Sequence, residues 1–233
     1  MTNKRRLALF DLDHTLLPLD SDYQWAQYLA LNGHAGDPEQ ALRRNDELMD
    51  RYNAGTLSAE ESYGFMLGLL TLGTVEQLEH WRSDYIKQII QPAVTPQALE
   101  LVNNHANNGD LCAIVTATNN FVTKPIAPLF NIKHLVATEA ELKEGKYTGN
   151  MVGKPCYQEG KILHLNNWLA GMGFKPSDFE EIWFYSDSIN DLPLLEAVSH
   201  PVATNPSPSL RKIAQERSWK TLDLFSELAD HKS

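Results

Sequence analysis

The fold is decided by the stretch Leu7-Ala8-Leu9-Phe10-Asp11-Leu12-Asp13-His14-Thr15-Leu16. Its first four residues are apolar and predict a short, buried β-strand. The two carboxylates that follow, Asp11 and Asp13, are costly to place together unless a cation pairs with them or they share a proton. In an open α/β sheet, ligands bind outside the carboxyl ends of the strands. The stretch therefore predicts a strand that ends at the mouth of a sheet, where Mg²⁺ could hold both carboxylates.

The composition narrows the classes of partner. The 233 residues, 42% of them hydrophobic, suffice for one large domain or two small ones with a real core. The net charge of −10 argues against nucleic acid or an anionic membrane surface as the main partner. In so acidic a chain, a phosphate-binding site needs a metal ion and a few local cations that reverse the local field.

Targeting and membrane signals are weak in this sequence. The basic residues 1–6 are followed by only four apolar residues before Asp11, too few for a secretory signal. The longest uncharged stretch, residues 62–75, is shorter than the ~20 residues that a membrane-spanning helix takes. The two cysteines, Cys112 and Cys156, provide no disulfide framework. We expect a cytoplasmic protein.

Residues 19–92 differ in pattern from the rest of the chain. They contain no convincing strand, and their apolar residues recur at helical spacing. Ser58, followed by acidic residues, is a typical helix start. We expect a helical cap domain at 19–92, inserted into an α/β catalytic core formed by 1–18 and 93–233. The alternative is that these helices merely cover the sheet.

From Pro92 onward, helix and strand patterns alternate, which indicates a parallel sheet with crossover helices. The predicted strands are 111–115, 134–138, 182–185, 201–204 and an edge strand within 219–224. The predicted helices are 95–106, 122–130, 160–171, 192–198 and 208–217. A turn at 144–149 between two extended arms predicts a small flap. The fold class is thus α/β, a doubly wound, mostly parallel sheet with an inserted helical cap.

Polar residues follow three of the predicted strands, and a lysine precedes the last of these. They are Asp11 with Asp13, Thr116, the run 187–191, and Lys161 at the start of its helix. The carboxyl ends of parallel strands lie along one edge of the sheet, so these groups can meet in space.

The order and type of these residues resemble the motif series of the haloacid dehalogenase (HAD) superfamily. That series consists of Asp-x-Asp-x-Thr, a strand-end Thr or Ser, a Lys, and Asp-x-x-x-Asp. The resemblance covers most of the chain, including the cap between the first strand and the second motif. It is closest to the phosphoserine-phosphatase-like branch, subfamily IB, with which the chain shares Gly145-Lys146-Tyr147-Thr148-Gly149 and Tyr185-Ser186-Asp187-Ser188-Ile189-Asn190-Asp191-Leu192.

The resemblance implies a Mg²⁺-dependent phosphatase. Asp11 would be the nucleophile that forms an aspartyl-phosphate. Asp13 would protonate the leaving alcohol and then activate the hydrolytic water. Mg²⁺ would bind the Asp11 carboxylate, the Asp13 backbone carbonyl and Asp187. Asp191 would orient Lys161 or a metal-bound water without binding the metal itself, with Asn190 assisting.

The same resemblance implies a set of phosphate-binding groups. Lys161, the Thr116 hydroxyl, and backbone N–H groups near Ala117 and Leu12 would hold the transferring oxygens. Two alternatives stay open, namely that Lys161 is a solvated helix residue and that Lys154 is the phosphate-binding lysine.

The substrate side departs from phosphoserine phosphatases. Their cap carries a Glu that reads the serine ammonium, and Asp20 falls in that slot here, with Asp22 nearby. The position of their carboxylate-binding Arg falls on Met66; Arg51 or Arg82 could substitute for it, but neither is placed by the motif. An acidic cap without a carboxylate clamp favours a phosphate ester whose organic end is cationic or neutral.

Histidinol phosphate, an amino-alcohol ester, fits this description. Asp20 would pair with its amine, and an aromatic cap residue would stack on its imidazole, the candidates being Tyr23, Trp25 and Tyr63. The alternative for these aromatics is packing in the core of the cap. The Ser-Gly-Gly second motif of phosphoserine phosphatases is replaced by Thr116-Ala117-Thr118, which leaves less room beside the phosphate.

Several other functions use related motifs. A dehalogenase needs no acid at the position of Asp13, which argues against that reaction. A phosphoserine phosphatase and a phosphomutase remain alternatives, as does a signalling module phosphorylated on Asp11, which a large cap would obstruct. The expected partner is a small phosphorylated metabolite, and the oligomeric state stays open.

Overall fold

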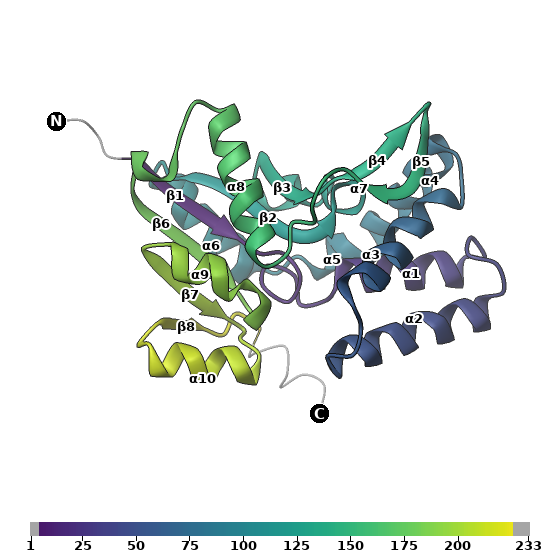
Figure 1. Cartoon of the computed structure of the whole chain (residues 1–233), viewed down its shortest axis with the longest axis horizontal. Coiled ribbons are helices and arrows are strands. Elements are labelled where there is room, and N and C mark those ends of the chain that lie inside the picture. Colours follow the sequence, from purple (N-terminus) through teal and green to yellow (C-terminus); the bar gives the residue numbers. More distant parts are fainter. Residues whose placement is uncertain (1–4, 226–233) are drawn as a thin grey trace.

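The computed structural model describes residues 5–225, and the first four and last eight residues, including part of the basic start, lie outside this range (Figure 1). Its main sheet has six parallel strands in the order β3-β2-β1-β6-β7-β8. The strands are β1 (Arg5–Phe10), β2 (Leu111–Asn119), β3 (His134–Thr138), β6 (Phe179–Ser186), β7 (His200–Thr204) and β8 (Lys220–Leu222). The predicted doubly wound parallel sheet is confirmed.

Helices cover both faces of the sheet because successive strand residues point to opposite faces. In β1, Ala8 and Phe10 pack in the cluster that includes α6 (Pro96–Asn107). Leu7 and Leu9 face the other cluster. That second cluster is formed with α8 (Glu159–Gly171), α9 (Leu192–Ala197) and α10 (Pro208–Glu216).

The order of the strands places a switch point of the topology beside β1. From β1 the chain winds outward through β2 and β3, and it then returns to place β6 on the opposite side of β1. The loops that leave the carboxyl ends of β1 and β6 therefore diverge, which makes this junction the expected binding crevice of a doubly wound sheet.

The segment between β1 and α6 is helical, and it lies at one end of the molecule, apart from α8, α9 and α10 (Figure 1). Its helices are α1 (Ser21–Leu31), α2 (Pro38–Asn53), α3 (Ala59–Gly68), α4 (Val75–Tyr85) and the short α5 (Gln91–Ala93). Ser58 begins α3 with a capping box, since its hydroxyl accepts from the Glu61 N–H and the Glu61 side chain accepts from the Ser58 N–H. The predicted flap is the hairpin β4 (Ala140–Lys143) and β5 (Lys146–Met151), which packs on α3.

The helix predicted at 122–130, which Pro125 and Pro128 were expected to distort unless they fell near its start, is divided in the structure. The structure has a single turn, α7 (Asn120–Thr123), followed by a separate 3-10 turn at Ala127–Phe130. Pro125 and Pro128 lack the N–H that a continuing helix needs, and their rings clash with the preceding turn. The apolar spacing that suggested one helix instead serves two short turns that bury Val122 and Phe130.

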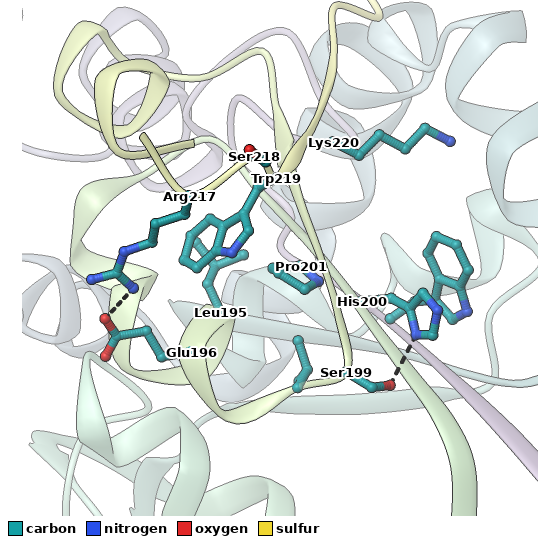
Figure 2. Close-up of a pocket in the computed structure, with 11 residues that line it drawn as sticks. Leu195, Glu196, Ser199, His200, Pro201, Arg217, Ser218, Trp219 and Lys220 are labelled. Atoms are coloured by element: carbon teal, nitrogen blue, oxygen red, sulfur yellow. Dashed lines mark hydrogen bonds and ion pairs between the residues drawn. The ribbon is translucent and has the colours of Figure 1, made fainter. Parts of the chain in front are cut away.

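A groove of about 860 Å³ lies at the edge of the sheet opposite the β1–β6 crevice. His200 and Lys220, the first residues of β7 and β8, contribute to its wall together with Trp219 (Figure 2). Among residues 5–225, no helix is long and apolar enough to cross a membrane.

Candidate active site

Asp11 continues the hydrogen-bonding pattern of β1 for one residue beyond the strand. Its N–H donates to the carbonyl of Tyr185 on β6 at 2.9 Å, which fixes the backbone at the crevice. The side chain is only 7% exposed, and its Oδ1 lies 2.7 Å from the Nζ of Lys161. A buried carboxylate is thus held at the strand junction by a cation from α8, the helix that packs on the same face of the sheet as Leu7 and Leu9.

Lys161 lies on the first turn of α8 and is 2% exposed. Its ammonium donates to Asp11 and to Asp191, at 2.7 Å each. Asp191 also accepts from the Ser186 hydroxyl at 2.7 Å, which anchors the far end of this chain of contacts. Burial alone lowers the pKa of Lys161, but the attraction of Asp11 and Asp191 outweighs it and raises the pKa above its usual value.

These contacts bear on the two alternatives for the lysine, namely a solvated Lys161 and a phosphate-binding Lys154. Lys161 is not a solvated helix residue, whereas Lys154 is exposed and its carbonyl accepts from His164. The helix begins tightly at this point, because Gly160 packs against the Pro155 carbonyl, where a Cβ would lie 2.1 Å from the oxygen. That close approach requires glycine immediately before the buried lysine.

Thr15 brings the carboxylates of the first and last motifs together. Its hydroxyl lies 3.3 Å from Oδ2 of Asp11 and 3.3 Å from Oδ1 of Asp187. It also accepts from the Asp187 N–H at 3.0 Å. The sequence alone gives Thr15 no role, although the Asp-x-Asp-x-Thr pattern contains it. Its partner Asp187 lies 172 residues away in the chain.

The carboxyl groups of Asp11 and Asp187 would be stabilised in their ionised form by a further cation. Burial, followed by the charges of neighbouring carboxylates, raises the pKa of Asp11 to about 7 and that of Asp187 to about 8. In the first case Lys161 only partly offsets these effects. Two carboxylates that resist ionisation beside one another are a typical environment for a divalent ion.

The donor set fits Mg²⁺. Asp11 and Asp187 offer hard oxygen ligands, and the Asp13 carbonyl can supply a third. Among the described residues, no group of three or more His, Cys, Asp or Glu side chains is placed to hold a metal. Mg²⁺ keeps several waters and is usually bound by one or two carboxylates, which Asp11 and Asp187 could supply.

The Asp13 side chain turns away from this cluster. Its Oδ1 accepts from the N–H of Ser21, the first residue of α1, at 2.7 Å, and its Oδ2 accepts from the Thr118 hydroxyl at 2.8 Å. Burial and then the charge of Asp20 raise the pKa of Asp13 to about 6. The carboxylate thus lies between the first cap helix and the end of β2.

The predicted phosphate-binding groups occur around an irregularity of β2. The pairing of β2 with β3 shifts register between Val115 and Asn119, so that the strand runs past its predicted end at 115. Within the shifted part, the buried Thr116 hydroxyl accepts from the Thr118 N–H at 3.2 Å. The Ala117 carbonyl accepts from Thr138 at 2.7 Å.

The remaining predicted residues lie close by in the structure. Leu12 is fully buried and its carbonyl accepts from the N–H groups of 15, 16 and 17, which forms the tight turn of the first motif. Asn190 lies in a 3-10 turn at Ile189–Asp191, where its N–H donates to the Ser188 hydroxyl.

Comparison with known proteins identifies the family. A family model described as haloacid dehalogenase-like hydrolase matches residues 8–196. The chain belongs to this family. The predicted resemblance and the predicted hydrolase class are therefore confirmed.

Relatives of this HAD-like hydrolase carry phosphatase names. It is 38% identical to a histidinol-phosphatase from Neisseria meningitidis, over 94% of this chain and 99% of that protein. It is 27% identical to a phosphoserine phosphatase from Mycobacterium tuberculosis, over 93% of this chain and 70% of that protein.

Solved structures share the fold. A Bordetella pertussis protein of unknown function is 57% identical, with a TM-score of 0.93 over 96% of this chain and all of that one. A substrate-bound phosphoserine phosphatase is 21% identical, with a TM-score of 0.67 over 94% of this chain and 93% of that one.

The cap of this HAD-like hydrolase presents two carboxylates beside Asp13. Asp20 caps α1 by accepting from the Tyr23 N–H at 2.8 Å, and Asp22 accepts from the Asn119 amide at 3.1 Å. Burial first, and neighbouring carboxylates next for Asp22, raise both pKa values. Among the described residues, no lysine or arginine forms an ion pair with either side chain.

The three aromatic candidates occupy different places. Trp25 has no exposed surface and packs against Tyr85 and Phe121, so it belongs to the core of the cap, the alternative that the sequence left open. Tyr23 donates to Asp46, away from the crevice. Tyr63 alone of the three reaches the second motif, with its hydroxyl 3.5 Å from the Ala117 carbonyl.

Two arginines, Arg51 and Arg82, were candidates for a carboxylate clamp. Among the described residues, neither forms an ion pair with Asp20 or Asp22. Arg51 pairs with Glu61 at 2.9 Å on the surface of the cap. Arg82 donates to the Phe121 carbonyl at 2.7 Å and lies over the Phe121 ring. Arg51 thus joins α2 to α3, and Arg82 joins α4 to α7.

Proposed function

We propose that the protein is a Mg²⁺-dependent phosphomonoesterase that acts through an aspartyl-phosphate on Asp11. The observation that carries this proposal is the buried Lys161 ammonium, held at 2.7 Å by both Asp11 and Asp191. A cation buried at this cost is retained where it stabilises charge on a transferring phosphoryl group. The phosphatase names of relatives that span nearly the whole chain support the same reaction.

The residues divide the reaction between them. Asp11 attacks phosphorus, the ester P–O bond breaks, and Asp13 gives its proton to the departing alkoxide. Asp13 then takes a proton from the water that hydrolyses the aspartyl-phosphate. A pKa of about 6 suits a group that must both give and take a proton near neutrality. When bound, Mg²⁺ would neutralise charge between Asp11, Asp187 and the phosphoryl oxygens.

Phosphate binding falls to groups around the crevice. Lys161, the Thr116 hydroxyl and the N–H groups near Leu12 and Ala117 would hold the three equatorial oxygens. Asp191, fixed by Ser186, would keep the lysine in place, and Asn190 would support the same turn.

We propose that residues 19–92 form a cap that excludes water while Asp11 is phosphorylated, over a core of 1–18 and 93–233. The hydrogen bond from Ser21 to Asp13 supports this, since it joins the first cap helix to the reacting group. The substrate would be a small phosphorylated metabolite of the cytoplasm.

For the organic end of the substrate we propose an amino alcohol, such as that of histidinol phosphate. Asp20 and Asp22 are half-buried carboxylates that form no ion pair with a lysine or arginine in the described chain, and a substrate ammonium would neutralise them. Met66 stands where a carboxylate-binding arginine would be expected. The 38% identical relative named histidinol-phosphatase supports this substrate, and the relatives named phosphoserine phosphatase make phosphoserine the second candidate.

The test is phosphate release from a panel of esters with Mg²⁺, run beside Asp11→Asn. The panel contains histidinol phosphate, phosphoserine, phosphoethanolamine and a sugar phosphate. We expect release by the wild type, loss with Asp11→Asn or EDTA, and the highest kcat/KM for histidinol phosphate. A higher kcat/KM for phosphoserine would refute the proposed substrate and leave the phosphatase intact.

Silence across the panel, with Mg²⁺ bound, would refute the phosphatase proposal itself. Turnover of a sugar bisphosphate would then indicate a phosphomutase. A long-lived phosphorylated Asp11 would instead indicate the signalling module.

A further inference from the structure

Thr118 occupies the third position of the second motif, where the sequence departs from Ser-Gly-Gly. The residue is 7% exposed and lies in the irregular part of β2. Its hydroxyl donates to Oδ2 of Asp13 at 2.8 Å. A glycine in this position could not make that contact, so the departure adds a hydroxyl directly against the Asp13 carboxylate.

The contact completes a two-sided support of Asp13. Oδ1 accepts from the Ser21 N–H, which belongs to the cap, and Oδ2 accepts from Thr118, which belongs to the sheet. A carboxylate held at both oxygens has one orientation about its terminal bonds, whereas a carboxylate held at one oxygen can still rotate.

The support itself is rigid. The Thr118 N–H donates to the buried Thr116 hydroxyl at 3.2 Å, so the residue that fixes Asp13 is itself fixed by a predicted phosphate ligand. The proposed phosphate ligand, Thr116, and the residue that holds the proton donor, Thr118, therefore lie on the same short stretch of β2. The Thr118 hydroxyl can donate to Oδ2 whether the carboxyl group is ionised or carries its proton on Oδ1, so the contact persists through both steps while the proton stays available to the leaving oxygen.

We propose that Thr118 is a positioning residue that aims the Asp13 carboxyl group at the leaving oxygen of the substrate. The proposal rests on the proposed function, in which Asp13 is the general acid. It predicts that removal of the Thr118 hydroxyl impairs proton delivery to the leaving group more than it impairs substrate binding or phosphoryl transfer itself.

The leaving group provides the readout. An alkoxide must be protonated as it departs, whereas p-nitrophenolate leaves without a proton. Since kcat/KM covers the steps through departure of the alcohol, the ratio of kcat/KM for the best alkyl phosphate to that for p-nitrophenyl phosphate reports delivery of the proton. A merely structural defect lowers both values together.

The experiment compares Thr118→Val, which preserves the shape, with Thr118→Ser, which preserves the hydroxyl. The matched control is Thr204→Val, a buried threonine of β7 whose hydroxyl donates to the Val202 carbonyl and to no other group among residues 5–225, with thermal unfolding measured for every variant. For Thr118→Val we expect a loss of about tenfold or more in kcat/KM for the alkyl phosphate. The loss for the aryl phosphate should be less than about threefold, the KM should change little, and Thr118→Ser should restore the ratio.

Equal losses on both substrates, or a wild-type ratio in Thr118→Val, would overturn the positioning role while the phosphatase stands. If Thr118→Val does not fold, Thr118→Ala takes its place under the same criteria. Absence of phosphate release by the wild type from either substrate would overturn the proposed function, and the positioning role with it.

Discussion

The two edges of the sheet use the same kind of interaction in opposite environments. At the carboxyl edge, the ion pairs of Lys161 are buried, with 2% of its side chain exposed. At the amino edge, Arg217 pairs with Glu196 beside the groove of Figure 2, with side chains 41% and 45% exposed. Removing charges from water costs several kcal/mol per ion, and a buried pair seldom repays it in stability. Stability alone therefore does not explain the buried pairs, which supports their proposed role in catalysis, whereas the exposed pair is typical of a solvated surface.

The largest expected effect follows from Lys161→Met at the carboxyl edge. The change keeps most of the volume but leaves Asp11 and Asp191 buried without their cation. We expect phosphatase activity to fall by about a thousandfold or more, as expected when a preorganised charge on the reacting group is removed. The metal-free protein should lose about 3–5 kcal/mol of unfolding free energy.

Steady-state kinetics and urea unfolding without Mg²⁺ measure the two effects. A Lys161→Met variant as active as the wild type would remove the distinction between the two edges.

Gly160→Ala should produce the next effect, because it displaces the turn that carries this lysine. The new Cβ would lie 2.1 Å from the Pro155 carbonyl, and backbone must move to relieve the clash. We expect about 1–3 kcal/mol of destabilisation. The kcat should fall by about 10–100-fold, since small displacements of a catalytic group are costly.

Gly171→Ala is the matched control in the same helix, because its Cβ would meet nothing within 4 Å. Thermal unfolding and kcat of the two variants should diverge. Equal behaviour would show that α8 tolerates movement and that Lys161 is less rigidly placed than its contacts suggest.

At the carboxyl edge, the sequence predicted the positions of those residues whose type is unusual at the end of a buried strand. Asp11, Asp187 and Lys161 stand out because charged groups in a buried context need a reason. The hydroxyls of Thr15 and Thr118 do not stand out, since threonine is common in strands and turns and their partners lie 172 and 105 residues away. Their function depends on register between distant segments, which local pattern does not contain.

Aromatic and apolar spacing was less informative than charge. Trp25 fits both a substrate platform and a core position at the same helical spacing, and only its complete burial separates the two. The helix expected at 122–130 had the right apolar period, but Pro125 and Pro128 divide it into two turns. The groove at the amino edge was not foreseen, because its wall combines two separate chain segments, 195–201 and 217–220, with Trp183 of β6, and these share no motif.

Asp22→Asn tests whether the carboxylates of the cap recognise a positive charge on the substrate. The amide keeps an oxygen to accept from Asn119, so the local structure should persist while the negative charge is lost. We expect kcat/KM for histidinol phosphate to fall about tenfold, equivalent to about 1.4 kcal/mol, with little change for a sugar phosphate. An equal fall for both substrates would contradict recognition of an ammonium by this carboxylate.

The smallest effect is expected from Arg217→Gln at the amino edge. An exposed ion pair contributes about 0–1 kcal/mol, so unfolding should shift little and less at high salt. The kcat and KM should stay at wild-type values, because the wall of the groove lies at the edge of the sheet opposite Asp11. A clear change in kcat would show that the two edges communicate through β6 and β7, the strands that join Trp183 and His200 of the groove to Ser186 and Asp187 of the site. Contrasting Arg217→Gln with Lys161→Met therefore measures how far burial, rather than the presence of an ion pair, marks the functional edge.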